Sequence, residues 1–241
     1  MKLEVLDNAD SVARKGAAMI AADARSAIAA RGRFAFAVSG GHTPWIMLRA
    51  LAGEDLPWAN VHIFQVDERV APDGHPDRNL THLRESLLAN APIPPQQVHA
   101  MPVESPDLEH APALYAATLQ QVLGSPPVLD LVHLGMGPDG HTASLVPADP
   151  VLQVMDADVA MTGVYQGRRR MTLTYPTLNR ARRVLWVVTG AEKVPMFQRL
   201  LDGDSSIPAG RVNREQAVVL ADRAAAGRQA ESKRGAGGVQ L

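Results

Sequence analysis

The sequence contains no cysteine among its 241 residues. That absence excludes a disulfide framework, thiolate catalysis and a thiolate metal site, and it is compatible with a reducing cytosol. Charge of neither sign is in excess, because the formal net charge is −1, so electrostatics give no case for nucleic-acid or anionic-membrane partners. No apolar run approaches membrane-spanning length, and the N-terminus lacks the apolar block of a signal peptide. We therefore expect a cytoplasmic protein.

Short apolar runs alternate with helical patterns along most of the chain. Spacing predicts a helix near 12–28, capped by Asn8 or Asp10, and further helices near 44–51, 79–88, 108–122 and 192–201. Apolar runs predict strands at 34–38, 61–66, 128–134, 159–164, 171–175, 184–189 and 217–221. This alternation favours one α/β domain over 1–226, with a mainly parallel sheet flanked by helices on both faces. The end, 227–241, has no apolar pattern and is expected to be a disordered tail.

A glycine-rich turn follows the apolar run 128–134 and carries both an acid and a base. It has the sequence Gly-Met-Gly-Pro-Asp-Gly-His-Thr-Ala-Ser over 135–144. Its glycines permit close approach of a ligand to the backbone, and Asp139 and His141 can reach one small volume. Because ligands of open parallel sheets bind beyond the carboxyl ends of strands, this turn is a candidate site for acid–base chemistry.

Three further polar clusters follow predicted strands. The segment Ser-Gly-Gly-His-Thr-Pro at 39–44 suits phosphate at a helix N-terminus, although an ordinary strand-to-helix turn has the same composition. The triplet Asp-Glu-Arg at 67–69 follows a buried strand, and it fits either the sheet edge or a charged surface. The arginines at 168–170 and Lys193 can pair with phosphate oxygens. Solvated surface charge is the alternative for the first two arginines.

Taken in order, these clusters closely resemble the 6-phosphogluconolactonase family, within the wider group that includes glucosamine-6-phosphate deaminases. The resemblance covers nearly the whole chain except the tail, through motifs at 36–44, 65–69, 130–145, 170–174 and 190–193. It implies a Rossmann-like α/β fold and hydrolysis of 6-phospho-D-glucono-1,5-lactone to 6-phosphogluconate in the oxidative pentose phosphate pathway. The family requires no cofactor. No pair of histidines has the spacing of a zinc site, His133 is expected to pack in the core, and for the oligomeric state we favour a monomer.

The resemblance also implies roles for individual residues. His141 would be the general base that takes a proton from water, because a free imidazole titrates close to neutral pH. Asp139 would orient the ring or stabilise the imidazolium, although a separation of two residues does not establish a hydrogen bond. Arg69 matches the family's active-site arginine and would bind phosphate or the developing oxyanion. The other residues expected to bind substrate or phosphate are Ser39, Gly40, Gly41, Thr43, Asp67, Gly137, Gly140, Arg170 and Lys193.

Two other functions stay open beside the lactonase. A glucosamine-6-phosphate deaminase is expected to carry a glutamate five residues after the histidine, where this chain has Val146, and usually a tyrosine in place of Arg69. A catalytically silent sugar-phosphate sensor would not need both Asp139 and His141. Four residues depart from the family pattern: Arg78 is expected to contact phosphate or occupy the loop surface, Pro195 to interrupt the start of a helix, and the others are His42 and Val146.

Overall fold

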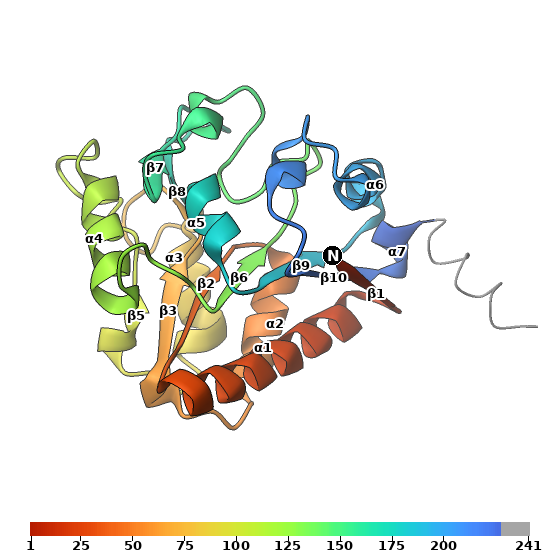
Figure 1. Cartoon of the computed structure of the whole chain (residues 1–241), viewed down its shortest axis with the longest axis horizontal. Coiled ribbons are helices and arrows are strands. Elements are labelled where there is room, and N and C mark those ends of the chain that lie inside the picture. The colour runs from red at the N-terminus through yellow and green to blue at the C-terminus, as the bar shows by residue number, and fades with distance from the viewer. Residues whose placement is uncertain (228–241) are drawn as a thin grey trace, which may run out of the picture.

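A seven-stranded sheet forms the centre of the computed structural model, which describes residues 1–227 (Figure 1). Its strand order is β1-β10-β9-β6-β2-β3-β5, and all neighbouring strands are parallel. These strands are β1 (Lys2–Leu6), β2 (Phe34–Val38), β3 (Val61–Gln65), β5 (Val98–His99), β6 (Leu131–Leu134), β9 (Val184–Val188) and β10 (Ala217–Asp222). The predicted α/β class is confirmed. The expected tail, apart from Gly227, lies outside the described residues.

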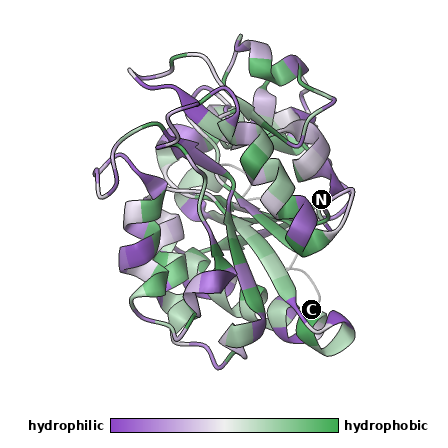
Figure 2. Ribbon diagram, turned by 90° about the vertical axis from the view of Figure 1, so that its left-hand side faces the viewer, coloured by the Kyte–Doolittle hydropathy of each residue, from purple (hydrophilic) through white to green (hydrophobic). Residues whose placement is uncertain are grey.

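Helices cover both faces of the sheet because alternate strand residues point to opposite sides. In β2, Phe34 and Phe36 belong to the core on the side of α1 (Ala9–Arg31) and α2 (His42–Ala52), whereas Ala35 and Ala37 belong to the core on the opposite side. Figure 2 shows the strands as mostly hydrophobic ribbon. The second face is covered by α4 (Ala111–Leu123), α5 (Tyr175–Arg180) and α6 (Val194–Asp202).

A small antiparallel sheet, which the sequence did not predict, lies beyond the main one. It has the order β4-β8-β7, from β4 (Asp67–Arg69), β8 (Arg170–Leu173) and β7 (Val159–Met161). The strands expected at 159–164 and 171–175 are therefore shorter, and the second is shifted by one residue at its start. Tyr175 begins α5 instead of ending a strand, because Pro176 occupies the first helical turn.

The structure decides several other details of the sequence reading. Asn8, not Asp10, caps α1, since its side chain accepts a hydrogen bond from Ser11 N–H at 2.9 Å. The helix expected at 79–88 is α3 (Asn79–Leu83) followed by a π-helical turn, Arg84–Leu88. The helix expected at 192–201 begins at Val194 as α6, after a 3₁₀ turn at Ala191–Lys193, and Pro195 lies in its first turn, where a missing N–H breaks no helical bond. A short helix, α7 (Arg223–Ala226), ends the described chain.

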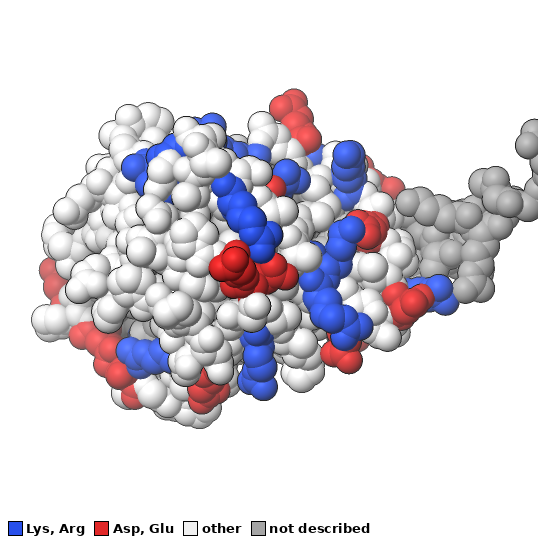
Figure 3. All heavy atoms as spheres, turned by 90° about the horizontal axis from the view of Figure 1, so that it is seen from below, with Lys and Arg blue, Asp and Glu red and all other residues white. Residues whose placement is uncertain are grey.

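Charged side chains of both signs are interspersed on the face shown in Figure 3. Helix α1 illustrates the pattern, since Lys15 lies 3.0 Å from Glu4 and Arg25 lies 2.9 Å from Glu54. Exposed pairs of this kind contribute little to stability, about 0–1 kcal/mol each. Within residues 1–227, no helix is both long enough and apolar enough to cross a bilayer.

Candidate functional site

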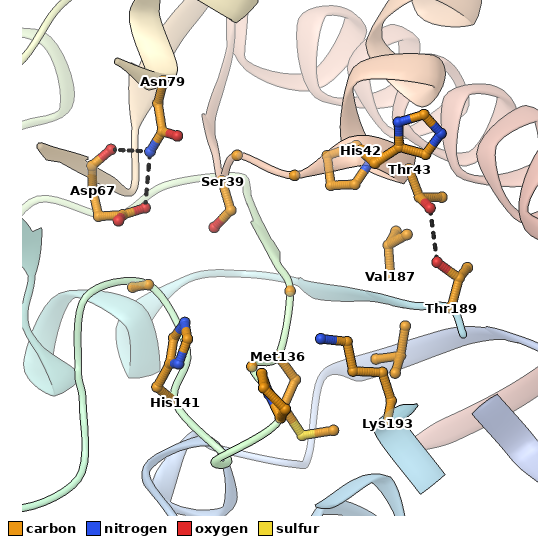
Figure 4. A pocket seen from close by; sticks show the side chains of 18 of the residues that line it. Ser39, His42, Thr43, Asp67, Asn79, Met136, His141, Val187, Thr189 and Lys193 are labelled. Atoms are coloured by element: carbon orange, nitrogen blue, oxygen red, sulfur yellow. Dashed lines mark hydrogen bonds between the residues drawn. The ribbon is translucent and has the colours of Figure 1, made fainter. Parts of the chain in front are cut away.

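The candidate site lies where β2 and β6 end side by side in the middle of the sheet. From β2 the chain continues to β3 on one side, and from β6 it returns to β9 on the other, so the loops diverge between them. Such a switch point is where open parallel sheets bind ligands. A cavity of about 360 Å³ lies here (Figure 4). The predicted site residues that line it are Ser39, Gly40, Gly41, Thr43, Asp67, Arg69, Gly137, His141, Arg170 and Lys193.

Asp139 lies behind His141 and outside the cavity lining. Its Oδ1 is 2.6 Å from His141 Nδ1 and also accepts the backbone N–H of His141 at 3.2 Å. Burial opposes the charged carboxylate, but the charge and hydrogen bonds of His141 outweigh it, so the pKa of Asp139 lies below its ordinary value. Because a carboxylate only accepts, Nδ1 carries the proton. The nitrogen of His141 that remains to take a proton is therefore Nε2.

Two glycines hold this turn in place for different reasons. A Cβ on Gly137 would lie 2.2 Å from the His141 ring, so the imidazole occupies the space that any side chain here would fill. Gly140 has φ +82°, and its carbonyl accepts the N–H of Ala209 at 3.0 Å. A Cβ there would lie 2.9 Å from Ile207. Gly140, expected to bind substrate, thus supports the turn from outside the cavity lining.

Two arginines reach the cavity from the small antiparallel sheet. Arg69 donates from Nη1 to the carbonyl of Asp77 at 2.8 Å and to Asn79 Oδ1 at 3.1 Å. Arg170 is 4% exposed and donates to Gln166 Oε1 at 3.0 Å. Within the described chain, the Nε of each has no hydrogen-bond partner. Arg69 is partly buried and Arg170 is buried, and guanidinium groups with such unused donors are suited to binding an anion.

The carboxylate of Glu68, which is fully buried, organises the segments that carry these arginines. It accepts the backbone N–H groups of Arg69, Asn79 and Leu80, each at 2.8 Å. Arg78, 1% exposed, places its Nε 3.1 Å from Glu68 Oε2 and donates to the carbonyl of Ala71 at 2.7 Å. Both expectations for Arg78 are therefore wrong, because it lies neither on the surface nor in the cavity lining.

The turn between β2 and α2 forms another wall of the cavity. Thr43 Oγ1 lies 2.7 Å from Thr189 Oγ1, which links this turn to the end of β9. Ser39 is 5% exposed, and its hydroxyl has no hydrogen-bond partner among the described residues. Lys193, which lines the same cavity beyond the end of β9, has its Nζ 3.8 Å from Glu192 Oε1. Together these segments offer a hydroxyl, the N-terminus of an eleven-residue helix and an ammonium group.

His133 supports this wall from below, as a packed core residue. It is 0% exposed, and its Nδ1 accepts the backbone N–H of Ser39 at 3.3 Å. Burial lowers the pKa of His133 to about 3, so the ring is neutral at physiological pH. The expectation for this residue is confirmed.

The structure also places three charged residues that the sequence singled out, and it adds site residues that the sequence did not indicate. Asp67, 4% exposed, accepts the Ser144 hydroxyl at 2.6 Å. Arg168 pairs with Asp77 at 2.6 Å and Arg169 with Glu109 at 2.7 Å, both outside the cavity lining. Residues that the sequence analysis did not assign to the site include Asn79 and Thr189, which line the cavity, Ser144, which donates to Asp67, and Tyr165, which contacts Asp139. In the described chain, no group of three or more His, Asp or Glu side chains is placed to hold a metal ion.

Comparison with known proteins identifies the family. The family model described as glucosamine-6-phosphate isomerases/6-phosphogluconolactonase matches residues 7–221. The chain belongs to this family. Among its relatives, a 6-phosphogluconolactonase of Nostoc sp. is 38% identical over 206 residues, covering 82% of this chain and 84% of the relative. Another from Mycobacterium tuberculosis is 34% identical over 238 residues, covering 93% and 96%. The resemblance read from the motifs is confirmed.

Solved structures of the family share the fold. A 6-phosphogluconolactonase from Thermotoga maritima superposes with a TM-score of 0.82 at 27% identity, covering 92% of this chain and 98% of that one. A monomeric glucosamine-6-phosphate deaminase superposes almost as well, with a TM-score of 0.81 at 18% identity, covering 94% and 99%. Since lactonase and deaminase share one fold, the site residues must separate the two activities.

Proposed function

We propose that this chain hydrolyses 6-phospho-D-glucono-1,5-lactone to 6-phosphogluconate. The observation that carries the proposal is one cavity that brings a carboxylate-backed imidazole, His141, together with two arginines. A lactone carbonyl is already electrophilic, so its hydrolysis needs an activated water, a stabilised oxyanion and a grip on the phosphate. Relatives named 6-phosphogluconolactonase, at 38% and 34% identity, support the assignment.

In the proposed reaction, His141 Nε2 takes a proton from water while the water oxygen attacks the lactone carbonyl carbon. Asp139 stabilises the resulting imidazolium through Nδ1. Arg69 is placed to stabilise the tetrahedral oxyanion or to bind the phosphate. When the bond from carbon to the ring oxygen breaks, Nε2–H returns its proton to that oxygen. The products are the opened sugar hydroxyl and a carboxylic acid, which ionises at neutral pH.

The phosphate of the substrate is assigned to the part of the cavity between the N-terminus of α2 and the cationic side chains of Lys193 and Arg170. Ser39, Gly41 and Thr43 provide donors at the N-terminus of α2, and Lys193 and Arg170 provide positive charge. Gly40 has no side chain, and a Cβ there would lie 2.1 Å from Asn79 Oδ1. Glycine at this position therefore lets the backbone of the turn approach Asn79, which binds Arg69.

Deaminase activity is disfavoured because the glutamate that it needs five residues after His141 is absent. Val146 occupies that position, is 4% exposed and cannot transfer a proton. The deciding experiment measures decay of freshly generated 6-phosphogluconolactone, corrected for spontaneous hydrolysis, and ammonia release from glucosamine 6-phosphate. We expect faster lactone decay and no ammonia. Ammonia release without faster lactone decay would instead support the deaminase assignment. Sugar-phosphate binding without either reaction would support the assignment as a sugar-phosphate sensor. The cytoplasmic location and the monomeric state stay predictions.

A further inference from the structure

Tyr165 lies at the tip of the β7–β8 hairpin, in a conformation fixed by a tight turn. It forms an isolated antiparallel bridge with Arg168, through two backbone hydrogen bonds with N···O distances of 2.9 and 3.2 Å. The two residues between them, Gln166 and Gly167, have φ of 51° and 80°. Two central residues with positive φ are typical of the type I′ turn, which matches the twist of a hairpin. The turn therefore fixes the backbone at Tyr165.

The side chain of Tyr165 contacts three groups of the candidate site. Its hydroxyl donates to Asp139 Oδ2 at 2.9 Å, the carboxylate oxygen that His141 does not use. Its ring packs edge to face against the His141 ring, with centroids 5.5 Å apart and planes at 69°. The guanidinium carbon of Arg170 lies 4.9 Å from the centroid of the Tyr165 ring. One aromatic side chain thus joins the base, its carboxylate and a cavity arginine.

We propose that Tyr165 is a positioning residue for the reaction, holding Asp139 by its hydroxyl and His141 by its ring. This rests on the proposed function. With one partner on each oxygen, the Asp139 carboxylate keeps one orientation beside His141, and the backbone N–H and Nδ1 of His141 still hold Oδ1 when the Tyr165 hydroxyl is absent. The hydroxyl also withdraws part of the carboxylate's charge, so Tyr165 limits how strongly Asp139 favours the imidazolium and keeps Nε2 able to return its proton.

The protonation state of Tyr165 agrees with this role. Burial raises the pKa of Tyr165, and the hydrogen bond to Asp139 raises it further, so the phenol stays protonated and donates at neutral pH. The other titratable groups around His141 come from the cavity walls: His42 of α2, Asp67 and Arg69 of β4, Arg170 of β8, and Glu192 and Lys193 beyond β9. A Tyr165→Phe substitution leaves all of these in place, so a change in His141 titration reports the lost hydroxyl.

The test compares Tyr165→Phe with Val164→Ala, a neighbouring change at a side chain that is 72% exposed and lies outside the cavity lining. For Tyr165→Phe we expect kcat to fall roughly tenfold with little change in KM, as for loss of one hydrogen bond to a charged group. The acidic limb of the pH–rate profile should move up by about 0.5 pH unit, because Asp139 then holds the imidazolium more tightly. Val164→Ala should match the wild type.

Two further measurements separate positioning from other causes. In an Asp139→Asn background, Tyr165→Phe should have no additional effect on kcat, and a persisting effect would overturn the proposal. Nuclear magnetic resonance titration of His141 should show its midpoint at higher pH in Tyr165→Phe, and an unchanged or lower midpoint would equally refute the proposal. This second readout needs no turnover. If wild-type protein fails to hydrolyse the lactone, the proposed function fails while the Tyr165 coupling is still decided.

Discussion

Arg69 and Arg170 are directly opposite each other in the antiparallel ladder of β4 and β8, and both line the same cavity. Like charges in this position destabilise a strand pair. Burial lowers the pKa of Arg170 and the positive charge of Arg69 lowers it further, while the nearby carboxylates of Asp67 and Asp139 act in the opposite direction without restoring the ordinary value. The pair is accounted for if an anion between or beside the guanidinium groups offsets the repulsion.

Replacing Arg170 should therefore separate folding from binding. We expect Arg170→Met to raise KM for the lactone by roughly 10- to 100-fold, as for loss of a hydrogen-bonded charge. The free energy of unfolding without ligand should stay level or rise, because the repulsion is gone. The matched control is Arg169→Met, since Arg169 pairs with Glu109 outside the cavity lining. Equal KM changes in the two variants would refute an anion-binding role.

The imidazole should control turnover and not binding. We expect His141→Asn to lower kcat by about 10²- to 10⁴-fold, the range of general-base catalysis, with KM nearly unchanged. Asp139→Asn should lower kcat less, because the ring keeps its place but loses the charge behind Nδ1. His110→Asn, at an exposed histidine outside the cavity lining, is the control and should behave like the wild type. Wild-type turnover in His141→Asn would eliminate this residue as the base.

Predictable parts of the fold are those with a local signal. Strands β2 and β9 are continuous apolar runs and β3 and β10 are mostly apolar, because both faces of a parallel sheet are buried, and the four were found within a residue or so. Strand β1 was missed because it lies at the sheet edge and is only partly buried. Strand β4 was missed because its three residues are all charged, and only pairing with β8 makes them a strand.

Site residues were likewise predictable where a local sequence motif carried them and unpredictable where only the tertiary fold brought them together. Motifs at strand ends predicted the residues that converge at the switch point, since parallel topology brings these ends together. Tyr165 lies 26 residues from Asp139 in the sequence, on a hairpin with no predictive pattern, and only the tertiary fold makes them partners. Arg78 was misplaced for a related reason, because nothing local indicates that Glu68 is buried and needs a counter-ion.

Adding a side chain at Gly137 should lower turnover, because the His141 ring packs directly against this glycine. A Cβ there would lie 2.2 Å from the His141 ring, so we expect Gly137→Ala to displace the imidazole and lower kcat by about 10- to 100-fold. Gly53→Ala is the control for adding a methyl group, because its nearest atom would be 3.5 Å away and Gly53 lies outside the cavity lining. Unchanged kcat in Gly137→Ala would mean that the ring position is not needed for turnover.

Acid should destabilise the protein through His133. Its pKa is about 3 when folded and about 6.5 in an unfolded chain, so between these values the unfolded state binds a proton that the folded state does not. The free energy of unfolding therefore decreases as the pH falls through 6.5. The decrease due to His133 alone is about 1.4 kcal/mol between pH 7.5 and 5.5. Urea unfolding at the two pH values measures the loss.

His133→Gln isolates this contribution, because glutamine does not titrate but can still accept the Ser39 N–H with its side-chain oxygen. The variant's unfolding free energy should depend less on pH by about 1.4 kcal/mol over the same interval, whatever its absolute stability. His62 and His99, whose pKa values burial also lowers, are present in both proteins and cancel in the difference. The exposed-site variant His110→Gln should keep the wild-type dependence. An identical pH dependence in His133→Gln would mean that His133 is protonated equally in the folded and unfolded states.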